Sequence, residues 1–199
     1  MRRIGLMFGA TVVLVGVMAT MAQAGGFRYP VGLTYASGPQ KVMDKMKENY
    51  YVADDFVLPV GVAFNPYYEF DNGVGVGASF GPLIYMAVDA GGGSDFNMVI
   101  PIGADIRYTL FTKNNVSPYV RGGFRYPIAF GDYLQSKSAG LFGAVGVEFL
   151  RTKRVSMGIE ISYDDSSIEV KSGSTGAKPF TKAQEVTPCG FMSGIYVVF

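Results

Sequence analysis

Hydrophobic and polar residues alternate with a period of two along most of this chain. Between residues 27 and 36 the large apolar side chains occupy every second position, from Phe27 to Tyr35, with smaller or polar residues between them. Successive side chains of a strand point to opposite faces, so this pattern predicts a strand with one apolar face. Eight segments follow the pattern, the last least clearly: residues 27–36, 56–70, 73–86, 97–111, 117–129, 139–150, 155–163 and 187–199.

Short and long connections alternate between the eight predicted strands. The short turns are residues 71–73, 112–115 and 151–154, and the longer connections are residues 37–55, 87–96, 130–138 and 164–186. This alternation is typical of outer-membrane barrels, which have short periplasmic turns and long extracellular loops. In the first long connection, apolar residues at helical spacing between Gln40 and Tyr51 predict a short surface helix.

Proline removes a hydrogen-bond donor from a sheet and is best tolerated near strand ends. Five prolines lie toward the outer ends of the predicted strands, next to the long connections: Pro59, Pro82, Pro101, Pro127 and Pro188. Their position at the predicted rim is compatible with the eight-strand assignment.

Hydrophobic residues make up 49% of the chain, yet no run beyond the N-terminal segment approaches the roughly 20 residues of a membrane-spanning helix. Only helices and closed barrels satisfy every backbone polar group in lipid. We therefore predict an all-β fold, a transmembrane antiparallel up-and-down β-barrel of eight strands. A soluble lipid-binding barrel in the periplasm is an alternative, but it leaves the outward aromatic residues of the first five strands unexplained.

The N-terminal segment has the pattern of a secretory signal peptide. Arg2 and Arg3 precede an uncharged, mostly apolar stretch, residues 4–18, and Ala22-Gln23-Ala24 provides a small-residue cleavage site. We predict that residues 1–24 are removed after export by the Sec route, which leaves residues 25–199 as one domain. A membrane helix that stays attached is the alternative.

The C-terminal segment Gly194-Ile195-Tyr196-Val197-Val198-Phe199 carries a more specific similarity. Together with eight alternating strands and four long loops, it resembles the eight-stranded outer-membrane barrels, such as the OmpA membrane domain and the opacity-type proteins. The resemblance implies a location in the outer membrane of a Gram-negative-type bacterium, in contact with its lipid. It also implies that Gly194, Tyr196, Val197 and Phe199 form a signal for the barrel-assembly machinery, although Val197 occupies a position where an aromatic residue is commoner.

The inward face of the predicted barrel carries four charges of each sign: Arg28, Arg107, Arg121 and Arg125, with Glu69, Asp105, Glu148 and Glu160. Side chains fill the interior of an eight-stranded barrel, so such charges need partners. We predict an interior charge cluster, with Asp105, Arg121 and Glu148 in direct contact; the full cluster comprises Asp105, Arg107, Arg121, Arg125, Glu148 and Glu160. Balanced charges favour a closed core, and a narrow pore lined by the same residues is the alternative.

Several classes of function conflict with the composition. The chain has no histidine, which deprives it of the usual general base of outer-membrane hydrolases, and its single cysteine offers no thiolate cluster for a metal. Asp164 and Asp165 are adjacent and would point to opposite faces of a strand. Removal of two of the 17 basic residues with the signal leaves 15 against 16 acidic ones, so no strong charge favours nucleic acid.

These observations predict a protein that is not an enzyme and needs no cofactor. Its expected role is structural, adhesive or interactive, through an extracellular partner that contacts loops 37–55 and 164–186. A small porin-like channel for ions or small apolar solutes is the alternative function.

Overall fold

The computed structural model describes residues 26–89, 94–172 and 182–199. The predicted signal peptide, residues 1–24, lies outside the described residues. No helix in the described part of the chain has the length and apolar character needed to cross a membrane.

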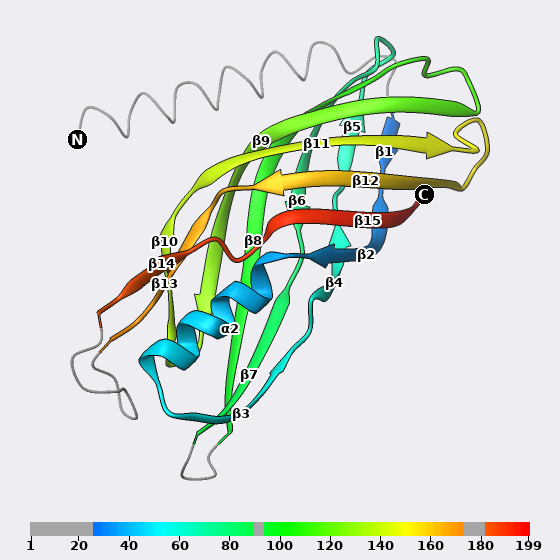
Figure 1. Ribbon diagram of the computed structural model, residues 1–199. Helices are drawn as coiled ribbons and strands as arrows, with labels where there is room; N and C mark the ends of the chain where they lie inside the picture. Colours follow the sequence, from blue (N-terminus) through cyan, green and yellow to red (C-terminus); the bar gives the residue numbers. More distant parts are fainter. Residues whose placement is uncertain (1–25, 90–93, 173–181) are drawn as a thin grey trace, which may run out of the picture.

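Eight antiparallel strands form a closed barrel, which confirms the predicted fold class (Figure 1). Around the ring the strands are β2 (Pro30–Ala36), β4 (Val60–Phe64), β6 (Val74–Phe80), β8 (Ser94–Thr109), β9 (Val116–Phe130), β11 (Gly140–Phe149), β12 (Ser156–Asp164) and β15 (Gly190–Val198). The last strand, β15, pairs with the first, β2, and so completes the ring. The short strands β1 (Gly26–Arg28) and β5 (Tyr67–Glu69) pair with each other at one end.

The two ends of the barrel differ. At one end, called the turn end here, tight connections join β5 to β6, β8 to β9 and β11 to β12. Each contains a residue with positive φ: Gly73 at 83°, Phe111 at 53° and Leu150 at 56°. Phe199 also lies at the turn end, where its carbonyl oxygen accepts a hydrogen bond of 3.1 Å from the amide of Tyr29. The opposite end is called the loop end.

A ring of strand interruptions separates the barrel from an extension at the loop end. Pro59, Pro82 and Pro188 each lie in a break between two strands, and Pro101 pairs with Pro127 within β8 and β9. Pro101 has no partner on its other side, because β6 pairs with β8 only up to Ile102 and β7 begins to pair at Val99. The missing amides therefore break no ladder. We call these five prolines the proline belt.

Beyond the proline belt the wall continues as a collar, which is built largely from the four predicted long connections. Most of residues 37–55, 87–96, 130–138 and 164–186 that the structure describes lie in regular elements. Besides the outer parts of β8 and β9, the collar consists of α2 (Gly38–Asn49), β3 (Val52–Val57), β7 (Leu83–Asp89), β10 (Leu134–Ser138), β13 (Ser167–Val170) and β14 (Gln184–Val186).

The predicted helix in the first long connection exists, but its apolar side chains are buried inside the collar. Val42, Met43 and Met46 are fully buried, and α2 packs against β3, β7, β13 and β14. Figure 1 shows α2 crossing the loop end between the β3–β7 side and the β10–β13–β14 side. An apolar core results, made of these three residues with Tyr50, Tyr85, Val99, Tyr133, Leu134, Ile168 and Val170.

Candidate functional site inside the barrel

Between the proline belt and the turn end, the inner wall of the barrel is polar. All six residues of the predicted interior cluster are buried: Asp105, Arg107, Arg121, Arg125, Glu148 and Glu160. The register between β8 and β9 places Arg107 directly opposite Arg121. Facing like charges repel each other, so this pair is stable only if carboxylates from other strands lie beside it.

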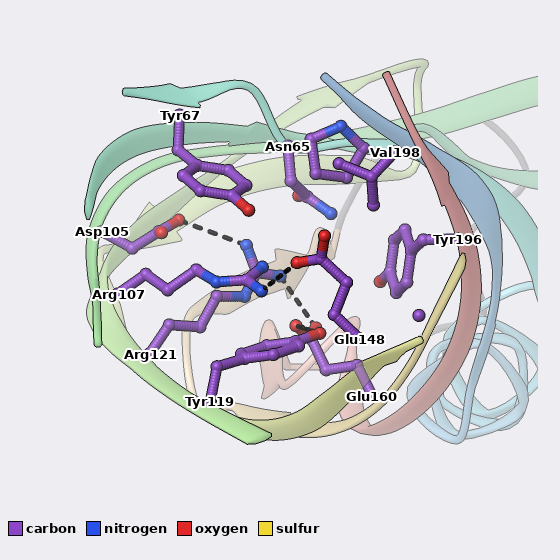
Figure 2. A pocket seen from close by; sticks show the side chains of 12 residues that line it. Asn65, Tyr67, Asp105, Arg107, Tyr119, Arg121, Glu148, Glu160, Tyr196 and Val198 are labelled. Carbon is purple, nitrogen blue, oxygen red and sulfur yellow. Dashed lines mark hydrogen bonds and ion pairs between the residues drawn. The ribbon is translucent and has the colours of Figure 1, made fainter. Parts of the chain in front are cut away.

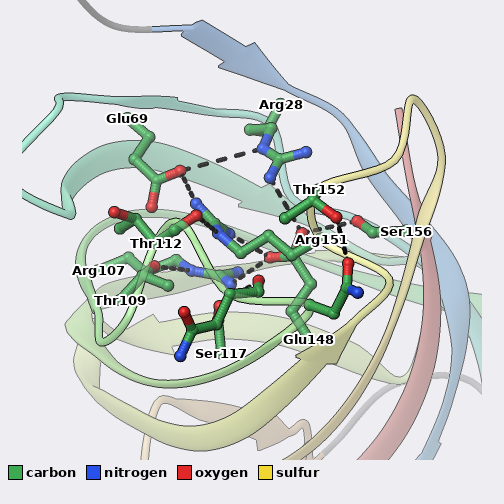
Figure 3. A network of polar contacts seen from close by, with 12 residues as sticks. Arg28, Glu69, Arg107, Thr109, Thr112, Ser117, Glu148, Arg151, Thr152 and Ser156 are labelled. Carbon is green, nitrogen blue, oxygen red and sulfur yellow. Dashed lines mark hydrogen bonds and ion pairs between the residues drawn. The ribbon is translucent and has the colours of Figure 1, made fainter.

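Glu148 of β11 provides one of these carboxylates, near the turn end (Figure 3). It is only 1% exposed. Its Oε2 atom lies 2.8 Å from Nη2 of Arg107 and 2.7 Å from Nη1 of Arg151, and its Oε1 atom lies 3.2 Å from Nη2 of Arg28. The hydroxyl of Ser156 donates a further hydrogen bond of 2.6 Å to Oε1. Both oxygens of Glu148 are therefore engaged.

A second carboxylate, Glu69, completes the cluster at the turn end. Its Oε2 atom pairs with Nη2 of Arg151 and lies 3.9 Å from Nε of Arg28. Arg151 reaches this position from the connection after β11, where its Nε also donates to the carbonyl oxygen of Thr112 at 3.2 Å. The side chain thus connects two turns with two acidic residues.

Arg121 is the centre of a separate cluster in the middle of the barrel (Figure 2). Its Nη2 lies 2.8 Å from Oε1 of Glu160, and its Nη1 lies 3.5 Å from Oδ2 of Asp105. The phenol of Tyr119 donates a hydrogen bond of 3.0 Å to the other oxygen of Glu160.

Arg125 forms a third cluster beside the proline belt, on its turn-end side. Its Nη1 lies 3.5 Å from Oδ2 of Asp164, which is fully buried, and its Nε donates to Oγ of Ser79 at 3.2 Å. Because β6, β9 and β12 all contribute to this contact, it ties three strands of the wall together.

Aromatic rings lie between the arginines. The guanidinium of Arg107 lies 4.6 Å from the ring centre of Tyr67 on one side and 3.5 Å from that of Tyr119 on the other. Phe142 has Arg121 at 4.7 Å and Arg125 at 3.6 Å from its ring centre. Such contacts attract a cation to a ring face and are stronger where water is excluded.

Glycines on the neighbouring strands make room for these large side chains. Gly146 of β11 pairs with both Tyr119 and Glu160 in the sheet, and a Cβ atom at Gly146 would overlap the phenol of Tyr119. Gly158 also faces the interior but has more space, since a Cβ atom there would come no closer than 3.6 Å to the carbonyl oxygen of Val147.

Little empty space remains in the barrel. Among the charged side chains a cavity of about 10 Å³ remains, and a second one of about 30 Å³ lies near the proline belt beside Arg125, Cys189 and Met192. A cavity of roughly 10–15 Å³ on this measure holds one water molecule. The described interior contains five arginines and five carboxylates in ion pairs: Arg28, Arg107, Arg121, Arg125 and Arg151, with Glu69, Asp105, Glu148, Glu160 and Asp164.

The predicted contact among Asp105, Arg121 and Glu148 is wrong in one member. Arg121 contacts Asp105 but takes Glu160 as its second partner, and Glu148 binds other arginines. The register explains the difference: Arg121 lies opposite Ala144, whereas Glu148, four residues farther along β11, lies opposite Ser117. At ~3.3 Å per residue this separates the two by roughly 13 Å.

Two members of the network were not predicted, Arg151 and Asp164. Asp164 continues the alternation of β12, whose even-numbered residues from Ser156 onward are buried. The period of two in this strand was therefore sufficient to predict that Asp164 faces inward. Arg151 follows Leu150, whose positive φ reverses the chain direction. Strand periodicity does not extend through such a turn, so the pattern of alternation could not place this side chain.

The four residues predicted as an assembly signal divide between the two faces of β15. Val197 and Phe199 face outward, whereas Tyr196 is buried in the barrel, where its phenol and Thr34 share a hydrogen bond of 3.2 Å. Gly194 pairs with Glu160 and Thr34 on either side of β15. Their role in assembly remains a prediction.

The arrangement can hold the barrel shut and fix its register, because each arginine joins strands that are distant in sequence. In the described residues no cluster of three or more acidic or cysteine side chains has a geometry suited to a metal ion.

Comparison with known proteins relates this fold to membrane proteins. Residues 10–185 match the model of a family described as the outer membrane protein beta-barrel domain. No curated protein matches the chain.

Solved structures with a similar fold include the outer membrane protein OprG from Pseudomonas aeruginosa, with a TM-score of 0.60, 15% identity, and coverage of 88% of this chain and 96% of that one. Neisserial surface protein A matches with a TM-score of 0.47 and 14% identity, over 88% of this chain and 99% of that one. The attachment invasion locus protein Ail of Yersinia pestis, solved with the heparin analogue sucrose octasulfate, matches with a TM-score of 0.48 and 14% identity, over 89% of this chain and 100% of that one.

Proposed function

Because this chain belongs to the outer membrane protein β-barrel domain family, we propose that it is a closed barrel of the Gram-negative outer membrane that acts through its loop end. The proposed role is structural, adhesive or interactive, with the partner outside the cell. Export by the Sec route belongs to the same proposal, as does assembly through Gly194, Tyr196, Val197 and Phe199.

One observation carries this proposal: the described interior is filled along its length by two layers of different chemistry. The layer toward the turn end is the network of five arginines and five carboxylates, where the cavities measure only about 10 and 30 Å³. The layer toward the loop end is the apolar core that α2 covers. A path for ions would have to cross both layers. The charges of the first layer are paired with one another, and the apolar side chains of the second cannot replace the water around an ion.

The same network argues against a channel for apolar solutes and against catalysis. An apolar solute that passed the collar would meet paired charges, whose separation is strongly unfavourable in a buried site. A carboxylate that acted as a base would have to leave an arginine, as Glu148 and Glu160 show with contacts of 2.8 Å. We therefore assign no enzymatic step to the interior.

The two long segments expected to contact a partner form a single surface. Asn49 at the end of α2 donates to the carbonyl oxygens of Lys171 at 3.1 Å and Lys182 at 3.0 Å, and the amide of Gln184 donates to Asn49 at 3.0 Å. Segments 37–55 and 164–186 are therefore held together. The outer face of α2, which exposes Lys41 and Lys47, is the proposed contact surface.

The proposal is tested with cells that express the protein. The double variant Lys41→Gln/Lys47→Gln should reduce the attachment of these cells to polystyrene and to cultured epithelial cells. The matched control is Lys113→Gln/Lys153→Gln, which removes the same charge from exposed positions at the turn end. Equal amounts of folded barrel, seen as a heat-modifiable band, make the comparison valid. If both double variants left attachment at the wild-type level, the proposed surface role would be refuted.

A further inference from the structure

The outer surface of the collar has two walls of opposite chemistry. On one side, outward residues of β7, β8 and β9 are apolar, and they include Phe96 at 54% exposure and Phe130 at 46%. We call this the apolar collar wall, made of Ile84, Phe96, Met98, Ile100, Ile128 and Phe130.

On the other side the outward residues of β10, β13 and β14 are polar. We call this the polar collar wall, made of Gln135, Lys137, Glu169 and Glu185. Lys137 and Glu169 form an ion pair of 2.6 Å on it. The two walls meet at the same level, because the amide of Ala129 in β9 donates to Oγ of Ser136 in β10 at 2.9 Å. The change from apolar to polar therefore occurs between two neighbouring strands.

The apolar collar wall continues the outer face of the barrel without a break. Strand β9 has 15 residues, and its outward positions from Val116 to Phe130 are apolar or glycine. Strands β12 and β15 have 9 residues each and end near the proline belt with Tyr163 and Phe191, whose rings lie 4.9 Å apart. With ~3.3 Å per residue and a strand tilt of about 40°, the apolar surface is roughly 10–15 Å taller on the β8–β9 side.

We propose that hydrocarbon chains of the outer leaflet cover the apolar collar wall, so that the protein sits deeper in the membrane on its β8–β9 side. The polar collar wall remains in water at the same height. A barrel reaches this position when it tilts or when the bilayer thickens locally, and both responses to hydrophobic mismatch have a modest cost per ångström.

Lipid is favoured over a second protein for two reasons. The wall is continuous with the apolar outer face of the barrel, which lipid contacts in this family of membrane proteins. Its six described side chains are also far fewer than the roughly 20–30 residues per partner of a stable protein interface.

The test uses environment-sensitive labels on single cysteines in a Cys189→Ala background. Phe96→Cys and Phe130→Cys report on the apolar collar wall, and Gln135→Cys is the matched position on the polar collar wall. Ile159→Cys serves as the reference in lipid and Lys153→Cys as the reference in water, since both side chains are exposed on the barrel. Folded protein in phosphatidylcholine vesicles is quenched by doxyl-labelled lipid in one experiment and by aqueous iodide in the other.

Labels at residues 96 and 130 should match the Ile159 reference, with a ratio of lipid to iodide quenching several-fold above that at residue 135. If they matched Gln135 instead, the wall would project into water and the proposal would be overturned. Protection from both quenchers would overturn it too, because protein would then cover the wall; disulfide cross-linking through Phe130→Cys would identify a second copy.

Discussion

At the scale of single residues, the barrel is organised by contacts that satisfy several charges at once. Glu148 is the clearest case, since Arg28, Arg107 and Arg151 all lie within 3.2 Å of its oxygens. A buried ion pair contributes little net stability when intact, but removal of one partner leaves the other charge buried without compensation. The network therefore specifies a register more than it provides stabilisation.

Glu148→Gln should lower the free energy of unfolding by about 3–5 kcal/mol, because the neutral amide leaves three buried arginines short of one negative charge. The matched control, Glu169→Gln, affects a solvent-exposed ion pair with Lys137 and should change the free energy of unfolding far less, because exposed ion pairs contribute little. Since the chain has no tryptophan, far-ultraviolet circular dichroism during denaturant titration is the measurement. Equal losses in both variants would contradict the assigned role of Glu148.

Gly146→Ala tests the close packing around Tyr119. The added methyl group would overlap the phenol, and we expect a loss of about 1–3 kcal/mol in the free energy of unfolding, typical of overpacking. Gly158→Ala places the same methyl group in the same interior, with its nearest neighbour at 3.6 Å, and should change the free energy much less. The reverse order of the two variants would show that the interior is loosely packed around Tyr119.

At the scale of elements, the strands of the barrel were predictable from sequence and the collar was not. Between the proline belt and the turn end, outward residues are apolar and most inward residues are small or polar, so the period of two is clear in strands such as β12. In the collar this contrast changes, because Leu134, Ile168 and Val170 face an apolar core. On β8 the inward Val99 belongs to the same core and lies between the outward Met98 and Ile100. This is why β10, β13 and β14 fall within the predicted loops.

The interior site was predictable to a similar extent, for a similar reason. Period-two alternation identified which charges face inward, including Arg107, Arg121 and Glu160. It could not identify their partners, because those depend on the stagger between strands. Arg121 and Glu160 come from β9 and β12, which are separated by β11.

The helix α2 should be held by its buried methionines. Met43→Ala and Met46→Ala should each lower the free energy of unfolding of the collar by about 2–5 kcal/mol, because each removes buried side-chain volume. Lys41→Ala on the exposed face of the same helix should stay within about 0.5 kcal/mol of the wild type. Hydrogen exchange of the α2 amides in folded protein measures the effect. Unchanged exchange in both methionine variants would mean that α2 does not depend on the apolar core.

At the scale of the whole molecule, the proposal requires the loop end to lie outside the cell. The lysines are suited to a direct test, because Lys41, Lys47 and Lys137 lie at the loop end and Lys113 and Lys153 lie at the turn end, all exposed. A membrane-impermeant amine reagent should modify the first group on intact cells and both groups after the outer membrane is opened. Modification of Lys113 or Lys153 on intact cells would reverse the orientation.

The central claim is that the barrel is closed by a charge network and an apolar core in series. Single-channel recording of the folded wild-type protein in planar lipid bilayers tests it most directly, with a known porin in the same membrane as a positive control. We predict no step currents across the working voltage range, because no path for ions crosses both layers. Stable, reproducible openings of the wild-type protein would contradict the claim and establish the channel in its place.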